Sequence, residues 1–117
     1  MSYSADNQEI KKNGYNNRGL ELAKLGQYEE AIAAYDKALE IDPEFHWAWN
    51  RKGITLNYGG RYSEALKVFK KCLEIKPEFH SAWVGKGMAL NHLRRYCEAI
   101  ASFDKALELT GDQSWQA

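Results

Sequence analysis

The sequence lacks several features that mark common classes of protein. It has only two prolines and two cysteines, and sixteen Lys and Arg residues balance sixteen Asp and Glu residues. No run approaches the roughly 20 apolar residues that span a bilayer. Nucleic-acid binders and polybasic membrane-surface proteins need an excess of positive charge, which this chain does not have. We therefore expect a folded protein with no dedicated nucleic-acid partner and no membrane partner.

The cysteines and histidines are too few and too scattered for a metal site. Cys72 and Cys97 are far apart in the sequence, whereas a zinc site needs about four ligands at short spacings. His46, His80 and His92 do not cluster with one another in the sequence, and there is no Gly-rich phosphate loop. The sequence predicts no enzyme, no metal and no cofactor. Its sparse cysteines and polar N-terminus favour a reduced, cytoplasmic location.

The chain contains an internal repeat. Residues 46–79 and 80–113 share fifteen identities, and residues 12–45 and 46–79 share fourteen. A length of 117 residues suits a single domain. We divide this domain into a lead-in at 1–11, three units of equal length at 12–45, 46–79 and 80–113, and a tail at 114–117.

Each unit is predicted to form two helices. Trp83, Gly87 and Leu90 show the spacing of one helix face, and a similar spacing recurs in the second half of the unit. The first two units place glycine in the turn between the helices, where a left-handed conformation is needed. The third unit has Leu93, Arg94 and Arg95 in this turn instead of glycine, so its turn is expected to be costlier. A proline ends the second helix of the first two units.

The seam between the two helices of a unit is predicted to alternate small and large residues. In the middle unit Gly53 and Ala65 allow close approach, while Trp49 and Phe69 fill the remaining space. We expect Trp49 and its equivalent Trp83 to be largely buried.

This pattern resembles the tetratricopeptide repeat. The residues that carry the resemblance in the middle unit are Trp49, Gly53, Leu56, Ala65, Phe69, Cys72 and Pro77. The chain departs from the pattern at Tyr15, Cys72 and Gly111, where the family has Trp, Ala and Pro. The resemblance implies an all-α fold, an α-solenoid of antiparallel helix pairs in a right-handed superhelix. It also implies that the first helices line a concave, ligand-binding surface.

The resemblance further implies which residues of each unit face a ligand. Those we assign to a peptide groove are Asn13, Asn16, Asn17, Lys24, Trp47, Asn50, Arg51, Asn57, Tyr58, Asn91 and His92. Trp47 suits a groove and helix packing equally well, and we interpret Ile54 and Met88, at two further positions of the set, as core. The set contains Lys24 and Arg51 but no carboxylate. It therefore predicts a protein or peptide partner that is neutral to mildly acidic.

Members of the family that read chaperone tails hold a terminal carboxylate in a clamp of Lys, Asn and Arg side chains. The matching positions of this chain hold Asn16, Leu20, Arg51, Ser81 and Gly85, and all five depart from that pattern. The sequence predicts that the chain does not bind chaperone tails by this clamp.

Two main functions remain open at this stage. The first is an interaction module, with a scaffold or adaptor role, that binds a peptide or partner helix in its concave groove. The second is a structural module that forms homo-oligomers through its C-terminal helix. On that helix Ile100, Leu107 and Leu109 continue an apolar stripe with no further unit to cover it, unless Trp115 folds back over it.

A third reading, RNA binding, rests on a small basic group formed by Lys86, His92, Arg94 and Arg95. The zero net charge makes it the weakest of the three.

Overall fold

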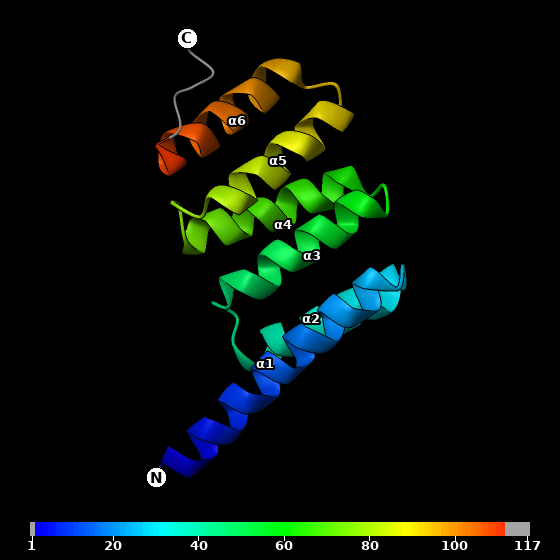
Figure 1. Cartoon of the computed structure of the whole chain (residues 1–117), viewed down its shortest axis with the longest axis vertical. Helices are drawn as coiled ribbons and strands as arrows, with labels where there is room; N and C mark the ends of the chain where they lie inside the picture. Colours follow the sequence, from blue (N-terminus) through cyan, green and yellow to red (C-terminus); the bar gives the residue numbers. More distant parts are fainter. Residues whose placement is uncertain (1, 112–117) are drawn as a thin grey trace.

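The protein is an elongated stack of helices, 53 × 30 × 20 Å (Figure 1). The computed structural model describes residues 2–111, and these contain no strand. The six helices are α1 (Ser2–Lys24), α2 (Tyr28–Ile41), α3 (His46–Tyr58), α4 (Tyr62–Ile75), α5 (His80–His92) and α6 (Tyr96–Thr110). Consecutive helices form antiparallel pairs, one pair per unit, and the pairs stack along the long axis (Figure 1). The predicted all-α solenoid of helix pairs is confirmed.

The first helix is longer than its counterparts in the other units. It begins at Ser2, so it includes most of the segment assigned to a lead-in. Lys12 anchors it to the rest of the stack, because its buried ammonium group bonds Asp42 at 3.1 Å and lies 4.5 Å from the centre of the Phe45 ring. The expected position of Trp115 over the last helix lies outside the described residues.

The turns within the units require a left-handed residue. Gly26 and Gly60 both have φ of 78°, and Arg94 has φ of 63° at the equivalent place in the third unit. A side chain in this conformation brings Cβ close to the backbone, which glycine avoids. The expected cost of the third turn thus has a structural basis, since Arg94 is the one non-glycine residue with positive φ in the described chain.

The seam is filled by the aromatic residues of the second helices. Tyr35 and Phe69 are fully buried. Trp49 and Trp83 are only partly buried, so the expectation that they are largely buried is wrong. Each indole lies at the rim of the seam because its N–H donates to the carbonyl oxygen of a proline six residues earlier, at 2.8 Å and 2.7 Å.

Cys72 occupies the position on α4 where the family pattern has alanine. It is buried, and burial raises the pKa of its thiol to about 11. A thiol in this state is a packing residue without nucleophilic character. Cys97 is exposed.

Candidate peptide-binding groove

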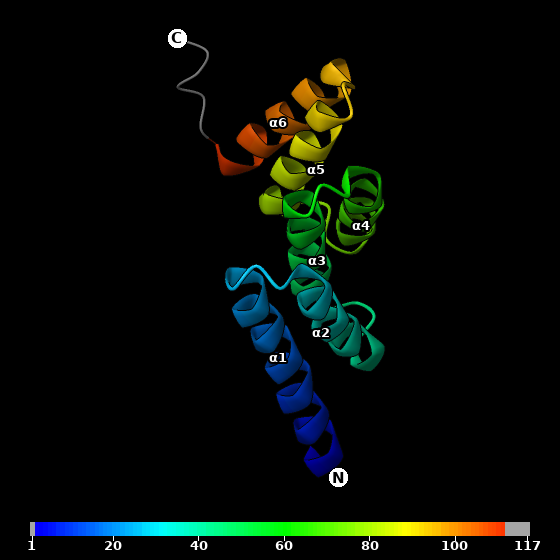
Figure 2. The ribbon, with the colours of Figure 1, turned by 90° about the vertical axis from the view of Figure 1, so that its right-hand side faces the viewer.

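The first helices of the three units, α1, α3 and α5, follow one another through the stack. Helix α3 contacts both α1 and α5. In Figure 2, α2 and α4 lie to the right of α1 and α3, so the second helices of the first two units are on one side of the stack. This arrangement depends on glycine, because a Cβ at Gly19, Gly53 or Gly87 would overlap the aromatic ring of the second helix of its own unit. Side chains that project from α1, α3 and α5 away from the second helices therefore share one surface.

Two adjoining hollows lie on this shared surface, and we call them together the groove. The first has a volume of about 320 Å³ and lies between α1, α2 and α3. The second has a volume of about 420 Å³ and lies between α3, α5 and the start of α4. Ile54 and Tyr58 line both, so the two hollows meet at α3. A ligand that follows the groove would cross all three first helices.

Pairs of aromatic rings form one edge of the groove near the turns. The ring of Tyr58 is stacked on that of Tyr28, with centroids 6.4 Å apart, although the residue is 71% exposed. One unit later Tyr62 stacks on His92, with centroids 4.2 Å apart. The sequence analysis selected Tyr58 and His92 but not their partners. The partners are Tyr28 and Tyr62. The sequence does carry a signal for them, because Tyr62 stands one repeat after Tyr28, just as His92 stands one repeat after Tyr58.

The charged residues of the groove are both cationic. Lys24 and Arg51 line the first hollow, and neither hollow has an Asp or Glu in its lining. Trp47 lies at the other end of α3, outside both hollows. It is 47% exposed, and the ring of Phe79 meets it edge-on at 4.9 Å. Trp47 thus packs against the last residue of its own unit, just before α5, and also presents an open face to solvent.

Asn50 and Asn57 serve mainly to join the second and third units. Asn50 is only 2% exposed, and its Nδ2 donates to Oγ of Ser81 at 3.2 Å. Nδ2 of Asn57 donates to the carbonyl oxygen of Gly85 at 3.1 Å. A ligand cannot reach Asn50 without moving α5, so its assignment to the groove is corrected. Asn57 still lines the second hollow.

The other selected asparagines contribute little to the two hollows. Asn13, Asn17 and Asn91 are exposed and line neither of them. Asn16 is partly buried, and its Oδ1 has no hydrogen-bond partner within residues 2–111. Conversely, Met88 is 44% exposed and lines the second hollow, so its interpretation as a core residue is wrong.

The stacked hairpins and the continuous groove on their shared face define a helical-repeat solenoid of the type that serves protein–protein interaction. The tetratricopeptide repeat profile matches residues 13–45, 46–79 and 80–113. The chain therefore belongs to the tetratricopeptide repeat family. The three matches coincide, to within one residue, with the units found from internal identities.

Solved structures of other proteins share this fold. The first TPR of Spaghetti, bound to HSP90 peptide SRMEEVD, superposes with a TM-score of 0.86 and 21% identity, covering 90% of this chain and 83% of that chain. The Sgt2 TPR domain from Aspergillus fumigatus gives 0.84 and 21%, covering 86% and 67%. MamA from Desulfovibrio magneticus RS-1 gives 0.77 and 28%, covering 84% of this chain and 55% of that chain. Among curated proteins, no sequence matches.

The described part of the chain contains neither a membrane-spanning helix nor a metal-binding group of side chains. No helix within it is both long and apolar enough to cross a bilayer. Residues 2–111 also contain no group of three or more His, Cys, Asp or Glu side chains placed to hold a metal ion.

Proposed function

We propose that this protein is an interaction module that binds an extended peptide, or one face of a partner helix, in the groove of α1, α3 and α5. The observation that carries the proposal is the continuity of the two hollows across Ile54 and Tyr58. Exposed Tyr58 and Met88 offer apolar contact area, and aromatic residues are common where binding energy concentrates. The module would act as a scaffold or adaptor.

The charges of the lining support a ligand that is neutral to mildly acidic. Lys24 and Arg51 attract a carboxylate, and no acidic side chain in either hollow repels one. The attraction is limited to the first hollow, because the second is lined by uncharged residues and His92. We therefore expect apolar side chains of the ligand beside Val84 and Met88, and an acidic group beside Arg51.

The solved structures bound to an HSP90 peptide support peptide binding in general, but the residues of this chain do not supply a carboxylate clamp. At the two clamp positions of the third unit this chain has Ser81, whose hydroxyl accepts from Asn50, and Gly85. Gly85 has no side chain, and Phe69 occupies the space that one would need. We infer that the ligand is held by groove contacts along its length and not by its terminal carboxylate.

The proposal is tested by selecting peptides from a displayed random library on the immobilised chain and measuring their affinities by fluorescence anisotropy. Selected peptides should be neutral to mildly acidic. The double variant Arg51→Ala, Tyr58→Ala should bind them about tenfold more weakly, with a melting temperature within a few degrees of the original. Lys67→Ala, an exposed change on α4, is the matched control. Equal affinities for all three proteins would place the site elsewhere.

A second candidate function, self-association, is favoured by the exposed stripe on α6. Ile100 is 60% exposed, whereas its equivalent Leu66 is 5% exposed because α5 covers it. Leu107, with Leu109 near it on the same helix, is partly buried and lines a further hollow of about 460 Å³ beside Phe103. We propose that a second copy covers this stripe.

Sedimentation at about 100 µM, the weak end of ordinary affinities, tests this second candidate. The original chain should show concentration-dependent association, and the double variant Ile100→Lys, Leu107→Lys should be a helical monomer. A control with Lys at two exposed alanines, Ala33 and Ala101, should still associate. A chain that is monomeric throughout the concentration range would exclude this function.

A further inference from the structure

Equivalent positions at the two joints between units carry different charges. At the joint between α2 and α3, Nζ of Lys52 lies 2.7 Å from Oδ1 of Asp36. One unit later Lys86 replaces Lys52, and Lys70 replaces Asp36. Within the described chain no carboxylate lies within 4.0 Å of the ammonium group of Lys70 or Lys86. The second joint therefore holds two lysines without ion pairs where the first joint holds an ion pair.

A second acidic residue is also missing at this joint. Arg61, which precedes α4, bonds Glu64 in the first turn of that helix and, in addition, Glu29 of the preceding unit. Ser63 stands one unit after Glu29, so within residues 2–111 Arg95 has only Glu98, in the first turn of α6, as an ionic partner. Compared with the first joint, the second has lost two carboxylates; it has gained Lys70, and it has Ala101 where the first joint has Lys67.

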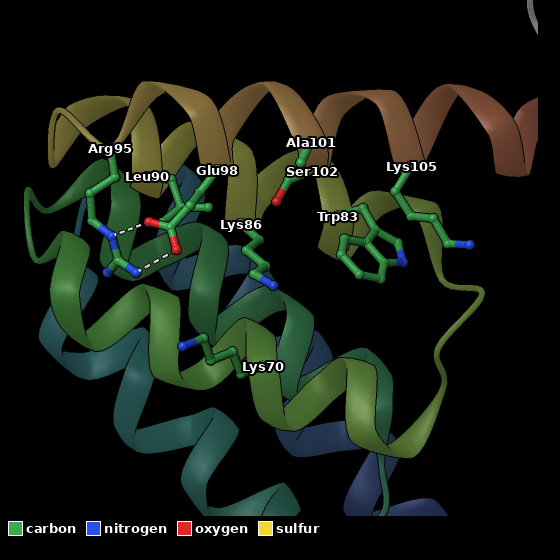
Figure 3. A pocket seen from close by; sticks show the side chains of 9 residues that line it. All are labelled: Lys70, Trp83, Lys86, Leu90, Arg95, Glu98, Ala101, Ser102 and Lys105. Atoms are coloured by element: carbon green, nitrogen blue, oxygen red, sulfur yellow. Dashed lines mark hydrogen bonds and ion pairs between the residues drawn. The ribbon is translucent and has the colours of Figure 1, made fainter.

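These groups surround a hollow of about 420 Å³ between α4, α5 and α6, which we call the cationic hollow. Figure 3 shows Lys86 from α5 and Lys70 from α4 extending into it, with the hydroxyl of Ser102 facing it from α6. The pair formed by Arg95 and Glu98 closes one end. Lys105 of α6 also lines the hollow, but it has an ion-pair partner, Glu108 at 3.9 Å, so Lys70 and Lys86 are the two lysines of the lining without one in the described chain.

The positive charge in the hollow is not balanced by its own lining. Glu98 is the only carboxylate among the residues that line it, and Oε1 of Glu98 accepts from Arg95 at 2.9 Å. Burial and, after it, the charge of Lys70 lower the pKa of Lys86. The Trp83 ring lies 4.9 Å from Nζ of Lys86 and offers this ammonium a further, weaker contact. A bound anion would therefore form ion pairs with ammonium groups that have no ion-pair partner in the described chain.

We propose that the cationic hollow binds a carboxylate of an acidic peptide segment, with Lys70 and Lys86 as the charged contacts and Ser102 as a hydroxyl donor. A peptide fits better than a nucleic acid, because a phosphate backbone needs an extended basic track. One unit earlier, Glu29 and Asp36 pair with Arg61 and Lys52, so these positions do not extend the positive surface. Trp83 also offers apolar surface beside the charges.

This site is separate from the groove and does not depend on the function proposed for it. Lys86 lies two residues from Val84 and two from Met88 on α5, so its side chain leaves the helix about 200° round from theirs. A single partner could contact both faces only by passing around the stack. The two sites can therefore be tested with separate variants.

The test uses fluorescein-labelled hexaglutamate and the full chain at about 50 mM salt, where surface charges are only partly screened. The informative variant is Lys70→Asp, which recreates at the second joint the ion pair of Asp36 with Lys52. Lys11→Asp is the matched control, because it makes the same change in net charge at an exposed position on α1. Circular dichroism melts should show both variants folded, with Lys70→Asp at least as stable as the original.

We expect saturable binding by the original chain and by Lys11→Asp, and a loss of about tenfold in Lys70→Asp. Amide shifts in ¹H–¹⁵N spectra should centre on Lys70, Lys86 and Ser102. The groove variant Arg51→Ala, Tyr58→Ala should bind hexaglutamate as the original does. Equal losses in Lys70→Asp and Lys11→Asp, or shifts centred on the groove, would overturn the proposal. So would tighter binding of an oligothymidylate than of hexaglutamate.

Discussion

Gly85 of α5 lies directly against the ring of Phe69 of α4. A Cβ at position 85 would lie 2.5 Å from Cε1 of Phe69 and closer still to Cζ. The ring cannot move away, because Gly53 touches it from α3 in the same manner, with a Cβ there at 2.6 Å from Cε1. One fully buried ring thus holds two units together, and it requires glycine on both sides.

Replacing Gly85 by alanine should destabilise the fold. Overpacking destabilises a fold by about 1–3 kcal/mol, and the better helix propensity of alanine offsets up to about 1 kcal/mol of this loss. We expect the free energy of unfolding to fall by roughly 1–2 kcal/mol in urea titrations. Gly14→Ala is the matched control, because a Cβ at position 14 meets nothing within 4 Å and should stabilise α1 slightly. Equal stability of the two variants would show that Phe69 has room to move.

Replacing Arg94 by glycine should stabilise the fold by relieving the strained backbone of the third turn. Arg94 has φ of 63°, a conformation that costs a residue with a Cβ about 1 kcal/mol. Arg94→Gly should therefore raise the free energy of unfolding by about 1 kcal/mol and the melting temperature by about 4 °C. The reverse change in the second unit, Gly60→Arg, should lower both by similar amounts. A melting temperature that does not respond to Arg94→Gly would contradict this account of the turn.

The stability of the fold should depend on pH through His46. Its Nε2 is buried without a partner in the described chain, and burial, followed by the charge of Lys76, lowers its pKa. The unfolded chain takes up a proton near pH 6.5 that the folded chain resists. The free energy of unfolding therefore does not depend on His46 protonation above pH 6.5, and it decreases as the pH falls below that value.

Urea midpoints at pH 7.5 and 5.5 measure this effect. The drop between the two pH values should be smaller in His46→Gln than in the original chain. His80→Gln is the control, because His80 holds the equivalent position in the next unit but is exposed. An unchanged drop in His46→Gln would assign the pH dependence to other groups.

The peptide SRMEEVD, present in the Spaghetti complex, should not be held by its terminal carboxylate. The clamp positions of the third unit offer only the engaged hydroxyl of Ser81 and the bare backbone of Gly85. Anisotropy titrations should give the same weak response for the free acid and for the C-terminal amide. A free acid that binds more tightly than the amide by about tenfold or more would reveal a clamp built from other residues.

Much of the fold and part of the groove could be predicted from the sequence. The repeat of identical residues identified the units, and local spacing identified two helices in each, because the contacts of a repeat protein are mostly between neighbours in the sequence. Lys24, Arg51, Tyr58 and His92, which line the two hollows, were instead selected from the family resemblance, which assigns ligand-facing positions within each unit. Asn50 was misjudged, because its position within the unit does not say how closely the next helix approaches.

The sequence by itself determined the stacked hairpins, the glycine turns and the exposed stripe at Ile100, since these follow from periodicity and residue size. Only the tertiary structure decided which polar side chains the joints bury. Gly85 lets α5 approach Phe69, and this approach brings the Gly85 carbonyl oxygen within 3.1 Å of Nδ2 of Asn57. The same packing places Lys70 and Lys86 in one hollow, with no carboxylate of the described chain within 4.0 Å of either ammonium group. Such distances depend on how two units meet, and no local pattern within one unit encodes them.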